Sequence, residues 1–107
     1  MTPLARLAAT IEARRDADPS ESWTAKLLSQ GPEKCAGKFG EEAVEAVIEA
    51  VRGDAGALTR EAADVLYHLL GMCAARGVTL AEVEEELERR EGASGVAEKA
   101  GRSSGAS

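Results

Sequence analysis

The chain has 107 residues, a length that fits a single small domain. Its formal net charge of -6 argues against a general affinity for nucleic acid phosphates or for anionic membrane surfaces. Apolar residues make up 44% of the chain and aromatic residues only 3%, a balance that favours close-packed helices over a sheet rich in aromatic and β-branched residues. We therefore expect an all-α fold, a compact bundle of four to five helices completed by dimerisation.

The sequence carries no signal for export or membrane insertion. Its N-terminus lacks the hydrophobic region of a signal peptide, and no apolar run has the length needed to cross a bilayer. The two cysteines, Cys35 and Cys73, have neither CxxC spacing nor a histidine cluster, so we interpret them as small buried hydrophobic residues. We therefore expect a cytoplasmic protein.

Capping residues mark two short helices in the first part of the chain. Thr2 precedes Pro3, and apolar residues then recur at helical spacing, so the first helix is expected to run to about Arg15. Ser22 is the N-cap candidate of a second helix, which Gly31 and the following proline end.

Two long helices are predicted next. The third runs from about residue 32 to about residue 52, with Gly53 as its C-cap. Gly37 and Gly40 each cost up to about 1 kcal/mol relative to alanine inside a helix, so a helix that starts after them is an open alternative. The fourth begins between residues 55 and 58 and ends near residue 76. One broad face of it is apolar, and three polar side chains follow the edge of that face: Glu61, Asp64 and His68.

A fifth helix and a tail complete the chain. Thr79 and Glu82 fit a capping box, which places the start of the fifth helix there. Its expected inward-facing residues are Leu80, Val83 and Leu87. From Gly92 onward Gly, Ser and Ala dominate. We expect a helical domain over residues 1–92 and a partly mobile Gly/Ser-rich tail over residues 93–107.

Two acidic clusters on the third and fourth helices are the strongest chemical signal. Carboxylates three residues apart share a helix face, as Glu42 does with Glu45 and Glu61 does with Asp64. A hard divalent cation with oxygen ligands relieves their repulsion, so the pattern predicts a Mg²⁺ site and phosphoanhydride hydrolysis. The same ExxE spacing occurs in the fifth helix without any sign of a metal. Spacing alone therefore leaves a solvated acidic helix face equally open.

Several short segments match a known family in their order and spacing. They are Trp23 to Leu28, Lys38 to Glu45, Glu61 to Leu70, and Ser94-Gly95 with Glu98-Lys99. Together they resemble the phosphoribosyl-ATP pyrophosphatases, which belong to the MazG-like all-α nucleotide pyrophosphohydrolases. The resemblance implies the second step of histidine biosynthesis, in which 1-(5-phosphoribosyl)-ATP and water give 1-(5-phosphoribosyl)-AMP and pyrophosphate. It also implies Mg²⁺ as cofactor and a homodimer. Because 107 residues leave no space for the cyclohydrolase domain fused to some members, we expect the monofunctional form.

The resemblance also implies residues of the site, carried over by motif position. The metal ligands are Glu42, Glu45, Glu61 and Asp64. The catalytic candidates are Glu41 and Glu45, with Glu41 either a further ligand or the base that acts on water. The helical angle does not settle which role belongs to Glu41 and which to Glu42. It places Glu41 and Glu45 nearest the apolar stripe of the third helix, whereas the family pattern favours Glu42 with Glu45. His68, one turn after Asp64, either supports that carboxylate by a hydrogen bond or has a structural partner at the core edge.

An acidic protein needs local cations to hold a substrate with several phosphates. The phosphate-binding candidates are Lys26, Lys38, Lys99 and Arg102. The tail departs from the family motif at Ala100-Gly101-Arg102, where Ala-Ser-Arg is expected, and this departure bears on the tail's contribution. Trp23 is either a purine-stacking residue or a core anchor.

Two other functions fit part of the sequence. A MazG-like pyrophosphohydrolase of ordinary or noncanonical nucleoside triphosphates would use the same metal chemistry, but it gives no role to the Trp23 to Leu28 segment or to the tail. A non-catalytic acidic helical interaction module would use the glutamates for solubility or for a basic partner. Under all three readings we expect no nucleic acid and no membrane as partner.

Overall fold

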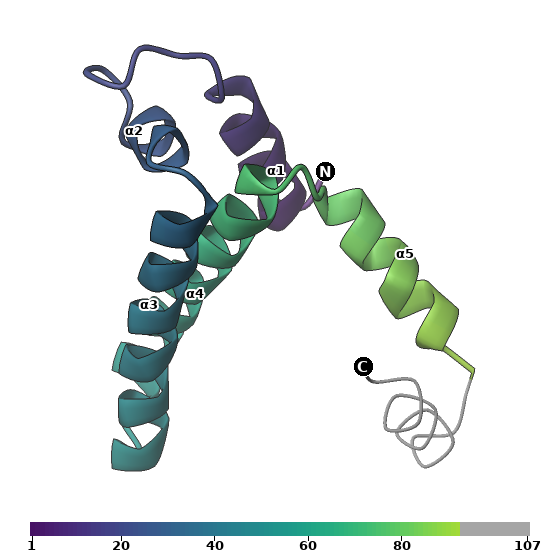
Figure 1. Ribbon diagram of the computed structural model, residues 1–107. Coiled ribbons are helices and arrows are strands. Elements are labelled where there is room, and N and C mark those ends of the chain that lie inside the picture. The colour runs from purple at the N-terminus through teal and green to yellow at the C-terminus, as the bar shows by residue number, and fades with distance from the viewer. Residues whose placement is uncertain (93–107) are drawn as a thin grey trace.

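The computed structural model describes residues 1–92, and within them all regular structure is helical (Figure 1). The five helices are α1 (Pro3–Ala13), α2 (Trp23–Ser29), α3 (Pro32–Arg52), α4 (Ala55–Ala75) and α5 (Leu80–Arg90). The expected all-α fold is therefore confirmed. None of these helices combines the length and the apolar character that a bilayer-spanning helix needs.

Local capping chemistry explains where most of the helices begin. Four helices start behind a side chain that accepts a hydrogen bond from a backbone N–H of the first turn: Thr2, Ser22, Asp54 and Thr79. Gly53 closes α3 in the left-handed conformation, with φ of 82°. Helix α3 also runs unbroken through Gly37 and Gly40, so the alternative of a later start is wrong.

The α3–α4 hairpin is the main structural unit. The two helices have 21 residues each, are joined by the short turn at Gly53 and Asp54, and lie side by side along their length (Figure 1). Helices α1 and α2 pack against the end of this hairpin that holds the start of α3 and the end of α4 (Figure 1). The turn end of the hairpin has no such cover among the described residues.

The buried core lies at the covered end of the hairpin. Ile11 of α1 packs with Leu70 and Ala74 of α4, and partly buried apolar residues surround them. Helix α2 contributes Leu27, which is only 1% exposed and lies against Gly71, where an added Cβ would be 3.4 Å from the leucine Cδ2. Cys35 is buried as expected, and its thiol donates to the Leu27 carbonyl.

Apolar residues of α3 remain exposed near the turn. The exposed fractions are 59% for Val44, 60% for Val47, 48% for Ile48 and 83% for Val51. These four residues occupy positions i, i+3, i+4 and i+7, so they form one continuous stripe along the helix. We call them the α3 stripe. Within residues 1–92, nothing packs over it.

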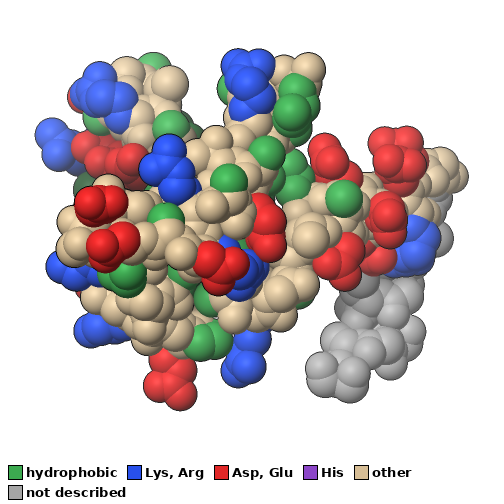
Figure 2. All heavy atoms as spheres, turned by 90° about the horizontal axis from the view of Figure 1, so that it is seen from above, with side chains coloured by type: hydrophobic (Ala, Val, Ile, Leu, Met, Phe, Trp, Pro, Cys, Tyr) green, Lys and Arg blue, Asp and Glu red, His purple; other side chains and the backbone are tan. Residues whose placement is uncertain are grey.

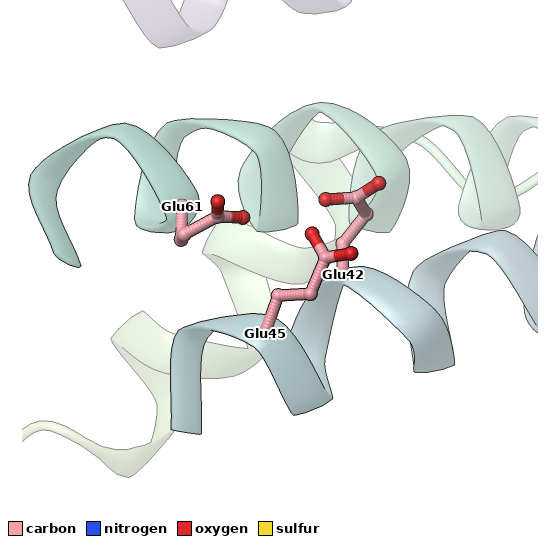
Figure 3. Close-up of side chains that lie close together, drawn as sticks. All are labelled: Glu42, Glu45 and Glu61. Atoms are coloured by element: carbon pink, nitrogen blue, oxygen red, sulfur yellow. The ribbon is translucent and has the colours of Figure 1, made fainter. Parts of the chain in front are cut away.

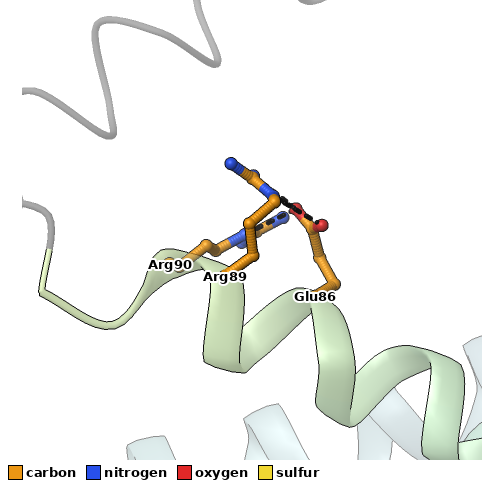
Figure 4. Close-up of polar contacts among 3 residues, drawn as sticks. All are labelled: Glu86, Arg89 and Arg90. Carbon is orange, nitrogen blue, oxygen red and sulfur yellow. Dashed lines mark hydrogen bonds and ion pairs between the residues drawn. The ribbon is translucent and has the colours of Figure 1, made fainter.

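Helix α5 projects away from the other helices (Figure 1) and has no buried residue. The expectation that Val83 and Leu87 face inward is wrong for the single chain, since they are 36% and 56% exposed. Figure 2 shows acidic side chains gathered over this projecting part. Near its end, Glu86 accepts hydrogen bonds from Arg89 and Arg90 (Figure 4). The helix keeps its capping box, so its local structure is specified even without a tertiary partner.

Candidate active site between α3 and α4

Three carboxylates converge between the two long helices. Glu42 and Glu45 extend from α3 and Glu61 extends from α4, and one oxygen of each lies within 4.8 Å of the others (Figure 3). The three-residue spacing puts the first two on one face of α3. The hairpin then brings Glu61 opposite them. Among the described residues, this is the only group of acidic, histidine or cysteine side chains with such convergence.

The convergence makes it costly to keep every carboxylate charged. Partial burial raises the pKa of Glu42, and the negative charges of Glu45, Asp64 and Glu61 raise it further. Burial also raises the pKa of Glu61, as do a shared hydrogen bond with Glu45 and repulsion from Glu45, Asp64 and Glu49. Both shifts mean that the site favours added positive charge, which a proton or a cation can supply.

The arrangement fits a magnesium ion. Glu61 Oε2 is buried and has no hydrogen-bond partner among the described residues, although a buried carboxylate oxygen normally has one. Carboxylate oxygens are the ligand type that magnesium takes from a protein. The three side chains each offer one such oxygen within 4.8 Å of the others, so they form a candidate ligand set for one ion.

Two other expected site residues lie beside this group rather than within it. Asp64 is exposed, yet its charge is close enough to raise the pKa of both Glu42 and Glu61. Glu41 points elsewhere: its Oε2 lies 3.5 Å from Lys38 Nζ, and its side chain is 68% exposed. The structure thus gathers Glu42, Glu45 and Glu61 but leaves Glu41 at the rim.

His68 is buried, not placed at the edge of an apolar face. It is 8% exposed, its Nδ1 has no hydrogen-bond partner in the described part of the chain, and the Tyr67 ring meets it edge-on at 5.0 Å. Burial lowers the pKa of His68, and so does the charge of Lys38, while Asp64 and Glu41 oppose the shift. By contrast Leu66, an apolar residue of the same helix, is 42% exposed. The reason is that α4 turns its polar edge toward α3.

Glu49 is a site neighbour that the sequence motifs did not identify. Its Oε1 is buried, has no hydrogen bond to any of residues 1–92 and lies 3.6 Å from Arg52 Nη1. The charge of Glu49 contributes to the raised pKa of Glu61. Its position four residues after Glu45, on the same helix face, was the available signal.

The expected phosphate-binding residues divide into two pairs. Lys26 lies exposed on α2, and Lys38 lies partly buried on α3, within reach of Glu41 and His68. Lys99 and Arg102 lie outside the described residues. The glutamates with ExxE spacing in α5 do not form a comparable group among the described residues. One of them, Glu82, is part of the capping box of that helix.

The fold and site define an all-α domain with a partly exposed carboxylate cluster between two long helices. Comparison with known proteins gives the family. The family model for phosphoribosyl-ATP pyrophosphohydrolase matches residues 4–91. The chain is 76% identical over 102 residues to a phosphoribosyl-ATP pyrophosphatase of Cereibacter sphaeroides, covering 95% of this chain and 99% of the relative. It is 74% identical to one of a Jannaschia species, with coverage of 95% and 100%, and 70% identical to one of Paracoccus denitrificans, with coverage of 94% for both chains. The chain therefore belongs to the phosphoribosyl-ATP pyrophosphohydrolase family.

Proposed function

We propose that this protein hydrolyses 1-(5-phosphoribosyl)-ATP to 1-(5-phosphoribosyl)-AMP and pyrophosphate, the second step of histidine biosynthesis. The observation that carries the proposal is the convergence of Glu42, Glu45 and Glu61 in a chain that matches the family over residues 4–91. Relatives with this name cover nearly the whole chain. A cluster of carboxylates that favours added positive charge suits a polyphosphate substrate that arrives with a divalent cation.

Glu42, Glu45 and Glu61 are the residues that would hold Mg²⁺, with Asp64 beside them. When bound, Mg²⁺ neutralises charge on phosphate oxygens and on the leaving pyrophosphate. The chain's own part is to fix these carboxylates on two rigid helices. The preorganised charges then require little rearrangement during the reaction.

The hydrolysis needs a base for the attacking water. The water oxygen forms a bond to the α-phosphorus, the bond from that phosphorus to the bridging oxygen of pyrophosphate breaks, and one proton of the water must be accepted. Glu41 is our candidate for that acceptor, because it lies at the rim of the site and is not one of the three converging side chains. Glu45 is the second candidate, since its carboxylate lies near both Glu42 and Glu61 and raises the pKa of each.

Lys38 and Lys26 are proposed to contact substrate phosphates. The ion pair of Lys38 with Glu41 is at most a weak surface pair, since both side chains are more than a third exposed. A substrate phosphate can therefore replace Glu41 as the partner of the Lys38 ammonium group at little cost. The Glu41 carboxylate is then free to accept a proton. His68 is proposed to support Asp64 from the buried side of α4, consistent with the mutual effect of their charges.

The working form is proposed to be a homodimer in which the α3 stripe is covered by a second copy. Four large apolar residues in one exposed row are unusual for a small monomeric protein. Leu66 of the adjacent helix is also exposed. Together they give the hairpin an apolar face that the chain itself does not cover.

The direct test is pyrophosphate release from phosphoribosyl-ATP, compared with ATP and dUTP, in the presence of Mg²⁺. We expect phosphoribosyl-ATP to have the highest kcat/KM and Glu45→Gln to lower it by about 100-fold or more. Glu85→Gln on α5 is the matched control, since it removes the same charge outside the site and should change little. Faster turnover of ATP or dUTP would overturn the substrate assignment.

A further inference from the structure

Trp23 is an aromatic side chain without a place in the core. It is the only tryptophan in the chain, opens α2 and is 54% exposed, so it is not a core anchor. Buried residues of the same helix, Ala25 and Leu27, hold α2 against the rest of the protein. Trp23 and Lys26 are three residues apart and both exposed, so they lie on one side of α2. An aromatic ring and a cation are thus presented together.

A cross-helix hydrogen bond fixes the first turn of α2 relative to the site. The hydroxyls of Thr24 and Tyr67 lie 2.5 Å apart, although they are 43 residues apart in sequence. Tyr67 follows Asp64 by about one turn of α4, which is a rise of about 4.5 Å. Thr24, the residue after Trp23, is therefore hydrogen-bonded to α4 about one turn beyond Asp64, which lies beside the carboxylate cluster.

The other aromatic rings are already engaged. The Tyr67 hydroxyl is hydrogen-bonded to Thr24 and its ring contacts His68, and Phe39 is partly buried in α3. The chain has one phenylalanine, one tyrosine and one tryptophan, and of these three residues Trp23 is the exposed one, at 54%.

We propose that Trp23 is the stacking surface for the purine base of the nucleotide substrate, with Lys26 on the same side of α2 as a phosphate contact. This inference rests on the proposed function, because it names the residue that recognises the base of the same substrate. Stacking of a base on an aromatic side chain changes affinity by roughly tenfold and requires only the flat face of the ring. The Thr24–Tyr67 hydrogen bond connects the residue next to Trp23 to α4, the helix that carries Glu61 and Asp64.

The single tryptophan allows a binding test that does not depend on activity. We expect phosphoribosyl-AMP, which keeps the base and is not hydrolysed by this reaction, to quench the fluorescence of Trp23 in a saturable way. Inorganic tripolyphosphate, with phosphates but no base, should leave the fluorescence unchanged. Quenching by tripolyphosphate as strong as by phosphoribosyl-AMP, or none by either, would overturn the inference.

Substitutions separate stacking from a structural role. Trp23→Leu should raise KM for phosphoribosyl-ATP by roughly tenfold with little effect on kcat, and Trp23→Phe should recover most of that loss because a ring remains. An equal KM for the leucine and phenylalanine variants would contradict stacking. A tryptophan emission maximum that shifts when the unaltered protein is diluted would also contradict it, because Trp23 would then lie at an interface between copies. If phosphoribosyl-ATP is not hydrolysed by the unaltered protein, the proposed function fails; if it is hydrolysed and Trp23→Leu has a normal KM, only this inference fails.

Discussion

Lys38 Nζ lies 3.5 Å from Glu41 Oε2 at the rim of the site, while the neighbouring Glu42 enters the carboxylate cluster. Adjacent helix positions differ by about 100° in direction, so the two glutamates cannot face the same partner. Both are acidic and consecutive in sequence, yet the hairpin gives them different surroundings. Their roles in hydrolysis should differ accordingly.

Substitution of each glutamate by glutamine tests this difference. Glu42→Gln removes one of the three converging carboxylates that we propose as metal ligands, so we expect Mg²⁺ affinity to fall by about 10-fold or more. Glu41→Gln should leave Mg²⁺ affinity close to that of the unaltered protein but lower kcat by about 100-fold, in the range typical for loss of a general base. Calorimetric titration of Mg²⁺ and steady-state kinetics measure the two effects. A loss of Mg²⁺ affinity in Glu41→Gln would instead make that residue a ligand.

The carboxylate cluster should lower stability when no metal is present. Burial and repulsion raise the pKa of Glu61, which means that the charged form is disfavoured in the folded protein. We therefore expect Glu61→Gln to have a higher Tm than the unaltered protein in EDTA. In Mg²⁺ the order should reverse, because only the unaltered protein gains from ion binding.

Thermal unfolding with and without Mg²⁺ decides this prediction. Glu85→Gln in α5 serves as the control, since Glu85 is exposed and lies outside the cluster. An equal Mg²⁺-dependent increase of Tm in Glu61→Gln and in the unaltered protein would show that Glu61 does not take part in metal binding.

The helix ends were predictable from sequence because each depends on a few consecutive residues. Ser22 caps α2 through a hydrogen bond to the backbone three residues later, and Gly53 ends α3 with a left-handed conformation. No distant partner is needed for either. The acidic clusters were predictable for the same reason, since the spacing within each helix sets which side chains share a face.

The choice of buried face was not predictable, because it depends on what packs against the helix. His68 is buried and Leu66 exposed, contrary to the order of their hydrophobicity, since α4 directs its polar edge at α3. Glu49 was missed because the family motif stops at Glu45, whereas the packing of α3 on α4 extends further toward the turn. The exposure of the α3 stripe was not predictable for the same reason, since it depends on the absence of a packing partner within residues 1–92.

A charge placed in the α3 stripe should prevent association. Val47 is 60% exposed in the single chain, and in a dimer that covers the stripe it becomes buried. Val47→Asp then places an unpaired carboxylate in an apolar interface, which is strongly unfavourable. We expect light scattering to show a dimer of about twice 11.1 kDa for the unaltered protein and a monomer for the variant. Thr10→Asp, on the exposed side of α1, should remain dimeric.

Loss of the dimer should also lower Tm at a given protein concentration, because association stabilises the folded chain by mass action. A monomeric unaltered protein at micromolar concentration would contradict the proposed interface. So would a Val47→Asp variant that stays dimeric, because the interface would then have to lie elsewhere.

The end of α5 should have an acid-dependent stability of its own. Side-chain hydrogen bonds from Arg89 and then Arg90 lower the pKa of Glu86 from 4.5 to about 2 (Figure 4). A carboxylate whose pKa is lower in the folded state stabilises that state above the unfolded pKa, and this contribution is lost as the pH falls from about 4.5 toward 2. We expect a carbon-detected NMR titration to give a midpoint near 2 for Glu86, and Arg89→Gln to move it upward. The titration of Glu12, whose pKa is lowered by Arg15 in α1, should not respond to that substitution. A Glu86 midpoint near 4.5 in the unaltered protein would mean that the two arginines do not hold this carboxylate in solution.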